Sequence, residues 1–319
     1  MKAVFCDKFG EPKDLVIREI DPPDAPKADE VQINLKYRGI AFADLVRMAG
    51  NYQDNRTPPY IVGGDGSGFV TRVGKNVTSL NPGDKVSSAG GCVELLNVPE
   101  SQVRKLPDDV DLELAAAFGN TYMTAFYGLN LAQLQPNQTL LVHGAGGGVG
   151  LAAVDLGKLT GARVIATASS DEKLAVVKQL GADEIINYSN GFREQVKDLT
   201  NGLGADVIYD PVGGDVFEES MRCIAPFGRI LIVGFASGRA ALAKTNHLLV
   251  KDASVIGYTV NSLQQKRPAL FHEYSETLIH HLAKGEIKPH ISHHFTMDEI
   301  VEAFQVIIDR RVIGKVLIS

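Results

Sequence analysis

The residues whose spacing most clearly suggests chemistry form a glycine-rich segment, GAGGGVG, at 144–150. It contains the pattern A-x-G-x-x-G, in which Ala145 replaces the first glycine of the dinucleotide-binding fingerprint. Glycines allow a tight turn and a close approach of the backbone to a pyrophosphate, which the amides at a helix start can bind. The alternative is a glycine-rich turn without a ligand. The candidate phosphate-binding residues are Gly147, Gly148, Val149 and Gly150.

The residues after the next expected strand distinguish between the two nicotinamide dinucleotides. An acidic residue at this place would hold the ribose hydroxyls of NAD and repel the 2′-phosphate of NADP. The sequence has Ser169 and Ser170 there, followed by Lys173, and small hydroxyls with a cation suit a phosphate. Asp171 is the competing residue, although a carboxylate in the first turn of a helix also stabilises the helix dipole. We therefore expect NADPH.

No set of metal ligands accompanies this segment in the sequence. Catalytic zinc needs three protein ligands and an open position, which Asp44 and Asp65 alone cannot supply. Without a Lewis acid, an alcohol lacks the group that would polarise its oxygen, whereas a good hydride acceptor needs only correct placement. We expect surface positions for the clustered histidines, and reduced structural thiols for the cysteines. These are His280, His281, His290, His293 and His294, and Cys6, Cys92 and Cys223.

The elements around the glycine-rich segment supply the context that a dinucleotide-binding turn needs. Residues 139–145, TLLVHGA, predict a buried strand, and residues 148–161 place apolar side chains at helical spacing. Residues 163–169, RVIATAS, predict the next strand. Strands and helices then alternate to about residue 235, which is typical of a parallel sheet covered on both faces.

The first 118 residues have a different pattern, with short strands cut by Pro, Gly and Asp turns. One short helix is expected at about 42–48. Near the C-terminus, Thr296 and Glu299 form a capping box before a helix, and the strand 315–319 follows. The chain thus reads as a β-rich part interrupted by an α/β part.

Bulk composition agrees with a soluble two-domain enzyme. The 319 residues are about twice the usual length of one domain, and 45% are hydrophobic and 22% charged. A net charge of −6 provides no attraction to nucleic acid or to anionic lipid, so neither is an expected partner. The N-terminal residues have no long apolar core, so we expect neither a signal peptide nor a membrane span. A cytoplasmic location is the expectation that follows.

Four segments of the sequence also carry a family likeness. They are VHGAGGGVG (142–150), VIYDPVGGDVFEESMRCIAPFGRILIVGFASG (207–238), LLVKDASVIGY (248–258) and RRVIGKVLIS (310–319). Together they resemble the quinone oxidoreductase, or zeta-crystallin-like, branch of the medium-chain dehydrogenase/reductase superfamily. The resemblance covers essentially the whole chain.

The resemblance implies an α/β fold in which a Rossmann domain, a doubly wound parallel sheet, is inserted into a GroES-like β-rich catalytic domain. We expect the catalytic domain at 1–118 plus 261–319 and the Rossmann domain at 119–260. Members of this branch are commonly homodimers joined through the edges of their Rossmann sheets. The segment VIGYTV (255–260) is therefore the expected dimer edge.

The resemblance also implies cofactor contacts where this sequence matches the family. Lys173 and Tyr188 fall where relatives hold the 2′-phosphate, and Thr124 falls where a threonine meets the nicotinamide. Phe235 falls where a side chain lines the nicotinamide pocket. A purely structural role is the alternative to cofactor binding for three of these residues. Tyr188 could be a strand-end aromatic and Phe235 a core residue, and for Thr124 both kinds of role stay open. With the glycine turn, the candidate cofactor-binding residues are Thr124, Gly147, Gly148, Val149, Gly150, Ser169, Lys173, Tyr188 and Phe235.

Tyr52 is the candidate catalytic residue, because it matches a tyrosine in the substrate region of the branch. It could donate a hydrogen bond or a proton to the reduced oxygen, or it could only form a wall of the pocket. For Asp44 we expect a structural role at the start of the short helix. Ala41 stands where the branch often has an asparagine, so that polar contact is absent. The segment Gly63-Gly64-Asp65 stands where zinc-bearing relatives show Gly-His-Glu, which again indicates that no zinc is bound.

These observations predict NADPH-dependent reduction of a small electron acceptor, a quinone or similar electron-poor carbonyl compound, by direct hydride transfer without zinc. Reduction of enones or enoyl thioesters is the nearest alternative, because the same fold and cofactor serve both reactions. A crystallin-like protein that binds NADPH without turnover is the alternative outside enzymes.

Overall fold

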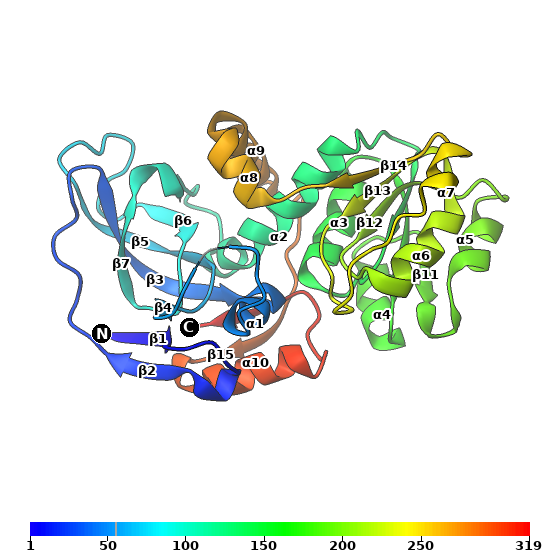
Figure 1. Ribbon diagram of the computed structural model, residues 1–319. Coiled ribbons are helices and arrows are strands. Elements are labelled where there is room, and N and C mark those ends of the chain that lie inside the picture. Colours follow the sequence, from blue (N-terminus) through cyan, green and yellow to red (C-terminus); the bar gives the residue numbers. More distant parts are fainter. Residues whose placement is uncertain (55) are drawn as a thin grey trace. The chain divides into compact units, whose positions relative to one another are not determined.

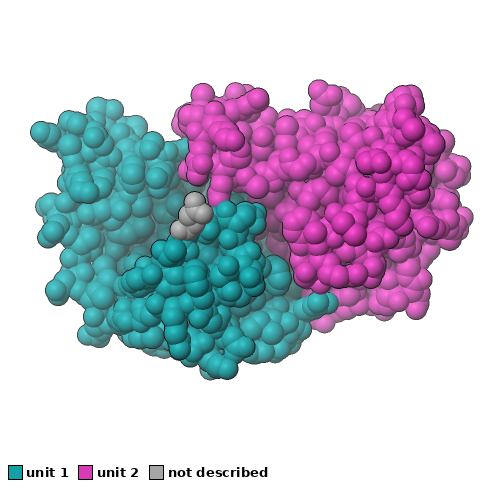
Figure 2. Space-filling view, viewed as in Figure 1, with its two compact units in different colours: residues 1–120, 289–319 teal, residues 121–288 magenta. Residues whose placement is uncertain are grey.

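The structure, a computed structural model, describes residues 1–54 and 56–319. Contacts divide the chain into two compact units, which Figure 2 shows in different colours. Unit 1 contains residues 1–120 and 289–319, and unit 2 contains residues 121–288.

Unit 1 is built on a seven-stranded sheet whose centre is the long antiparallel pair β3 and β5 (Figure 1). The strand order is β15-β16-β3-β5-β6-β8, with β7 also paired to β3, and a second sheet has the order β2-β1-β4. The strands are β1 (Lys2–Cys6), β2 (Val16–Glu19), β3 (Glu30–Ile40), β4 (Tyr60–Ile61), β5 (Asp65–Val73), β6 (Lys85–Ala89), β7 (Leu95–Pro99), β8 (Val103–Lys105), β15 (Ile291–Phe295) and β16 (Lys315–Ile318).

The core of unit 1 follows from the alternation of apolar residues along β3. Val31, Ile33 and Leu35 are almost fully buried and pack with residues of the neighbouring strands. The short helix α1 (Phe42–Met48) follows β3 directly, and its Met48 packs in a second cluster with Phe304 of α10 (Ile300–Ile308). The predicted capping box before α10 is confirmed in the turn η4 (Met297–Glu299). The other 3-10 turns of unit 1 are η1 (Pro12–Asp14) and η2 (Glu100–Gln102).

Unit 2 contains a six-stranded, entirely parallel sheet with the order β11-β10-β9-β12-β13-β14. From β9 the chain proceeds outward to β10 and β11, then returns to the other side of β9 for β12, β13 and β14. In such sheets ligands bind beyond the carboxyl ends of the strands, where the order reverses, which here lies between β9 and β12. The strands are β9 (Thr139–Val142), β10 (Arg163–Ala168), β11 (Glu184–Asn187), β12 (Ala205–Asp210), β13 (Ile224–Ile232) and β14 (Ser254–Gly257).

Helices cover this sheet, as the fully buried residues Leu140, Leu141 and Val142 of β9 require. α3 packs on β9 and β10, α4 on β10 and β11, and α6 on β12, with α5 beside α6 (Figure 1). The expected α/β fold class, with a β-rich part and a Rossmann-type parallel sheet, is therefore confirmed. The helices and the remaining turn are α2 (Leu112–Leu131), α3 (Gly148–Leu159), α4 (Asp171–Gln179), η3 (Tyr188–Asn190), α5 (Arg193–Leu199), α6 (Gly214–Cys223), α7 (Thr245–Leu249), α8 (Val260–Lys266) and α9 (Pro268–Ala283).

The end of unit 2 differs from the range 119–260 that the sequence suggested for the Rossmann domain. The contacts place residues 261–288, which include α9, in unit 2. One contact that joins these residues to unit 2 is aromatic: the ring centre of Tyr274 on α9 lies 5.0 Å from that of Phe126 on α2. Such long-range packing of helices is not visible in local sequence patterns.

Two further expectations concern cysteines and membrane spans. Cys6, Cys92 and Cys223 are buried and free, as predicted for structural thiols. Among the described residues, none of the helices combines the length and the apolar character that crossing a bilayer requires.

Candidate functional site

The sequence-predicted cofactor residues of unit 2 gather at one edge of the parallel sheet. Parallel strands all end at the same edge, and Ser169 follows β10, Tyr188 follows β11 and Phe235 follows β13 after a short connection. The glycine turn follows β9 at this same edge. Segments far apart in the sequence are thus brought together where a dinucleotide would bind.

The glycine turn ends in a helix start with available amides. Gly147 is the N-cap of α3, and the first intrahelical hydrogen bond runs from the Leu151 N–H to the Gly147 carbonyl at 2.8 Å. The amides of Gly148, Val149 and Gly150 precede this bond, so they belong to the first turn, whose N–H groups have no intrahelical acceptor. This arrangement fits a pyrophosphate, because the helix dipole adds partial positive charge at the same place.

Close packing explains two of the glycines. A Cβ atom on Gly150 would overlap the carbonyl oxygen of Gly144 and lie 2.8 Å from the Cα of Ala145. α3 can therefore approach the turn only with glycine at this position. A Cβ atom on Gly146 would lie 2.9 Å from the Cβ of Lys173, so the stem of that lysine packs directly on the turn. The predicted phosphate-binding lysine thus lies beside the predicted pyrophosphate site.

The residues after β10 have separate tasks. Ser170 is the N-cap of α4 and accepts a hydrogen bond from the Lys173 amide at 3.4 Å, while Ser169 is exposed at the strand end. Asp171 is the first residue of α4, and its Oδ1 accepts a hydrogen bond from the Asn187 side chain at 2.8 Å. The carboxylate that could have selected NAD is therefore engaged with the end of β11.

Tyr188 and Phe235 differ in their surroundings. Tyr188 starts the 3-10 turn η3, is partly buried and packs against the core cluster that includes Phe192. Phe235 is 47% exposed, so its structural alternative as a core residue is wrong. A Cβ atom on Gly213 would lie 3.0 Å from the Phe235 ring, which places this ring beside the loop that follows β12.

Thr124 is held by a residue that the sequence analysis did not select. The hydroxyl of Tyr258 donates a hydrogen bond to the Thr124 carbonyl at 2.9 Å, and Tyr258 directly follows β14. Burial raises the pKa of Tyr258, so the hydroxyl keeps its proton and remains a donor. The sequence signal was present, because VIGYTV was singled out, but only as a dimer edge.

His143 lies in the fully buried interior directly before the glycine turn. Its Nε2 lies 2.8 Å from the Ser220 hydroxyl, and its Nδ1 lies 2.9 Å from the Thr167 hydroxyl. Because Ser220 donates its own proton to the Val216 carbonyl at 2.7 Å, we assign the imidazole proton to Nε2. Burial lowers the pKa of His143 to about 3, so the ring is neutral at physiological pH.

Asp210 ends β12 at the point where the strand order reverses. Its Oδ1 accepts hydrogen bonds from the amides of Val212 (2.8 Å) and Gly213 (3.0 Å). Its Oδ2 is buried and has no hydrogen-bond partner within the described part of the chain, and burial raises the pKa of the carboxyl group. A buried acceptor without a partner at this edge of the sheet fits a site that receives a polar ligand.

Tyr52 belongs to unit 1, in the segment that follows α1. The guanidinium carbon of Arg47 lies 4.4 Å from the centre of the Tyr52 ring, which is a cation–π contact. Two carboxylates fix Arg47: Asp44 Oδ1 lies 2.9 Å from Nη1, and Asp54 Oδ2 lies 2.9 Å from Nε. The sequence analysis missed Arg47, because only the folded chain brings Asp54 back to α1.

Asp44 has the structural role that the sequence suggested. Its Oδ2 accepts a hydrogen bond from the Ala41 amide at 2.9 Å, at the start of α1. Burial raises the pKa of Asp44, and the neighbouring Arg47 opposes this shift. Asp65 is likewise engaged, because its Oδ2 lies 3.1 Å from the Lys315 ammonium group and its Oδ1 accepts a hydrogen bond from the Asn120 amide. In residues 1–54 and 56–319, no three potential ligand side chains gather into a metal site.

Comparison with known proteins identifies the family. Residues 27–108 match the family model described as "Alcohol dehydrogenase GroES-like domain", and residues 148–280 match the one described as "Zinc-binding dehydrogenase". The "Quinone oxidoreductase-like protein 2 homolog" of Nematostella vectensis is 39% identical over 326 residues, with 100% of this chain and 88% of that protein covered.

Solved structures agree with these matches. The quinone oxidoreductase of Escherichia coli complexed with NADPH superposes with a TM-score of 0.91 at 27% identity, covering 100% of this chain and 99% of the other. The CurK enoyl reductase has a TM-score of 0.89 at 26% identity, covering 100% and 98%. The chain is thus an oxidoreductase and belongs to the zinc-free quinone oxidoreductase branch of the medium-chain dehydrogenase/reductase superfamily.

Proposed function

We propose that the protein reduces quinones, or similar electron-poor carbonyl compounds, by direct hydride transfer from NADPH and without zinc. One observation carries the choice of cofactor: the stem of Lys173, four residues after the exposed Ser169, packs on the glycine turn, while Asp171 is bound to Asn187. A cation and hydroxyl groups at this place suit a 2′-phosphate. The quinone oxidoreductase of E. coli, which resembles this chain, was solved with NADPH.

The residues of the proposed site divide by the part of the cofactor or acceptor that they would contact. The first-turn amides of α3 would hold the pyrophosphate, Lys173 and Tyr188 would hold the 2′-phosphate, and Thr124 and Phe235 would lie on the nicotinamide side. Bound NADPH would supply the hydride, which an electron-poor acceptor takes up without a Lewis acid. Tyr52 would donate a hydrogen bond or a proton to the acceptor oxygen, and Arg47 keeps the Tyr52 ring in one orientation.

Cofactor selection is tested with Lys173→Ala. Loss of one charge-assisted phosphate contact weakens binding by about 1.5–3 kcal/mol, so we expect Kd for NADPH to rise about tenfold to a hundredfold. Kd for NADH, which lacks the 2′-phosphate, should change less than about threefold. The measurement is a fluorescence titration with each cofactor.

Lys178→Ala is the matched control, because Lys178 lies on the same helix and its ammonium group donates to the Asp183 carbonyl. This variant should bind both cofactors as the unchanged protein does. Equal weakening of NADPH and NADH by Lys173→Ala would show that Lys173 does not select the phosphate.

The acceptor class is tested by NADPH consumption with a panel of quinones, enones and an enoyl thioester, in the presence of a chelator. We expect the highest kcat/KM with a quinone and unchanged rates after chelation. Loss of activity in the chelator, with recovery after zinc is added, would refute a metal-independent reaction.

Reduction of enones or enoyl thioesters is the second candidate, and the likeness to the CurK enoyl reductase favours it. The panel separates the two, because an enoyl thioester would then give the higher kcat/KM. A third outcome, tight NADPH binding without turnover of any acceptor, would indicate a binding protein of the crystallin type.

A further inference from the structure

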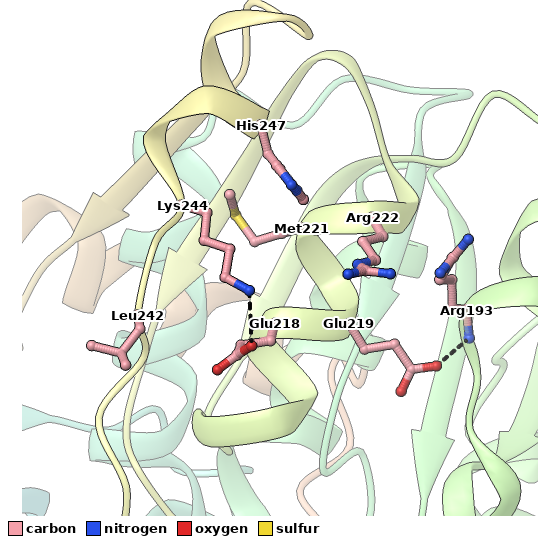
Figure 3. Close-up of a pocket in the computed structure, with 8 residues that line it drawn as sticks. All are labelled: Arg193, Glu218, Glu219, Met221, Arg222, Leu242, Lys244 and His247. Atoms are coloured by element: carbon pink, nitrogen blue, oxygen red, sulfur yellow. Dashed lines mark hydrogen bonds and ion pairs between the residues drawn. The ribbon is translucent and has the colours of Figure 1, made fainter.

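Unit 2 contains a cavity of about 270 Å³ that is separate from the proposed cofactor site (Figure 3). Three segments form it: the start of α5, one face of α6, and the segment from Leu242 into α7. None of the predicted cofactor-binding residues lines it. The lining residues are Arg193, Glu218, Glu219, Met221, Arg222, Leu242, Lys244 and His247.

The carboxylates of this cavity already have partners. Glu219 Oε1 accepts hydrogen bonds from the backbone amides of Phe192 (3.2 Å) and Arg193 (3.0 Å). Glu218 pairs with the ammonium group of Lys244 at 3.5 Å. Both carboxylates of the cavity are therefore already bound to donors of the protein itself.

Two of the remaining polar side chains, those of Arg222 and His247, lack such partners in the part of the chain that the structure describes. Within the described residues, neither the guanidinium group of Arg222 nor the imidazole ring of His247 has a hydrogen bond or an ion pair, and Figure 3 shows both side chains at the cavity. Arg193 lies beside them and pairs with Glu194 outside the cavity at 3.0 Å. Arginine and histidine from three segments thus converge on one space.

Further positive charge lies close to this space. The ammonium group of Lys251 donates to the Ile224 carbonyl at 2.5 Å, just after α6. The pKa of Lys251 is lowered, first by burial and also by the neighbouring cations Lys197 and Arg193. An anion bound in the cavity would offset this local repulsion, even though the whole protein is acidic.

We propose that this cavity binds a small organic phosphate, with the phosphate group on Arg222, Arg193 and His247 and an apolar body against Met221 and Leu242. Guanidinium groups bind phosphate oxygens through paired hydrogen bonds, and several cations around one point match a tetrahedral dianion better than a planar carboxylate. The volume accommodates a ligand larger than inorganic phosphate. This site is independent of the proposed reaction.

Arg222 also has a simpler possible role, because a cation near the end of α6 stabilises the helix dipole. Calorimetric titration with phenyl phosphate distinguishes the two roles. Arg222→Gln should keep the circular dichroism spectrum and weaken phenyl phosphate binding about tenfold or more. Inorganic phosphate should bind more weakly than phenyl phosphate, and benzoate more weakly still.

Two control variants locate the binding site. Arg239→Gln removes another exposed cation, which pairs with Asp215 on the same α6 at 2.5 Å but does not line the cavity, so it should bind phenyl phosphate normally. Lys173→Ala should also bind it normally, because Lys173 belongs to the proposed cofactor site. The proposal is overturned by no binding to the unchanged protein, by unchanged binding to Arg222→Gln, or by equal loss in either control.

Discussion

His143 shows how one buried polar side chain makes the stability of the Rossmann sheet depend on pH. It joins β9, β10 and α6 through Thr167 and Ser220, and burial keeps it neutral. Acid favours the unfolded state, because the unfolded chain binds a proton at an ordinary histidine pKa and the folded chain, with its buried neutral ring, does not. Stability from this group is therefore complete above pH 6.5 and is lost as the pH falls from about 6.5 toward about 3.

This difference predicts a measurable acid sensitivity of unit 2. Each pH unit in this window costs about 1.4 kcal/mol, so the folded state should lose roughly 3 kcal/mol between pH 7 and pH 4.5 from His143 alone. Urea unfolding followed by circular dichroism measures the loss. His143→Gln should be less stable at pH 7 but should show a shallower decline with acid.

The exposed His272 offers the matched control for this measurement. His272→Gln should retain the full decline, because this variant leaves His143 in place. Equal slopes for the unchanged protein and His143→Gln would contradict the role given to the buried ring.

In unit 1, the residue whose role can be tested in the same way is Tyr52, which Arg47 contacts through a cation–π interaction. If the Tyr52 hydroxyl contacts the reacting oxygen, Tyr52→Phe should lower kcat about tenfold to a thousandfold while Kd for NADPH stays unchanged. Steady-state rates with a quinone, beside cofactor titration, check this. An unchanged kcat would leave Tyr52 as a wall of the pocket, which is the alternative that the sequence also allowed.

At the scale of elements, the approach of α3 to the glycine turn decides whether a phosphate site can form. Gly150 must lack a side chain, whereas a Cβ atom on Gly147 would meet only the Gly144 carbonyl oxygen, at 3.4 Å. Gly147 also has an ordinary extended conformation, with φ of −83°. Comparing substitutions at the two positions therefore shows whether the packing of α3 on the turn, and not only the presence of a glycine, matters.

Gly150→Ala should push α3 away from the turn and destabilise the protein by about 1–3 kcal/mol, with loss of NADPH binding. Gly147→Ala should change the free energy of unfolding by less than about 1 kcal/mol. Urea unfolding and cofactor titration measure both effects. The packing argument fails if the two variants prove equally stable.

At the scale of the whole molecule, the outer edge of the Rossmann sheet is the expected site of homodimer formation. β14 pairs with β13 on one side and ends the sheet within the described residues. Large apolar side chains are exposed nearby: Leu249 is 79% exposed, Val250 78% and Phe227 70%. An apolar surface beside an unpaired strand edge favours association with a second copy of the chain.

Light scattering coupled to size-exclusion chromatography tests this expectation. The unchanged protein should elute as a dimer, and Val250→Asp should shift it toward the monomer by placing a charge in the apolar surface. Leu203, which is 68% exposed but far along the sequence from β14, provides the control, and Leu203→Asp should remain dimeric. If the unchanged protein elutes as a monomer, the prediction of a homodimer is wrong.

Local sequence determined much of the molecule. The glycine turn between a buried strand and a helix, the short helix 42–48 and the capping box at Thr296 depend on neighbouring residues, so periodicity and capping rules predict them. The strand order of unit 2 is consistent with the predicted alternation of strands and helices. The glycine turn and Ser169 were selected because each follows an expected strand, and parallel strands end at one edge, whereas Thr124, Tyr188 and Phe235 came from the family resemblance.

Only the tertiary structure decided the contacts between distant segments. Folding brings Asp54 to Arg47, whose guanidinium group lies over the Tyr52 ring, Tyr258 to the Thr124 carbonyl, and Tyr274 of α9 to Phe126 of α2. Side-chain packing selects these partners from many residues of the same type. The physical reason is that a hydrogen bond or an ion pair depends on atoms within a few ångströms, and sequence spacing alone does not specify such distances once the chain has turned back on itself.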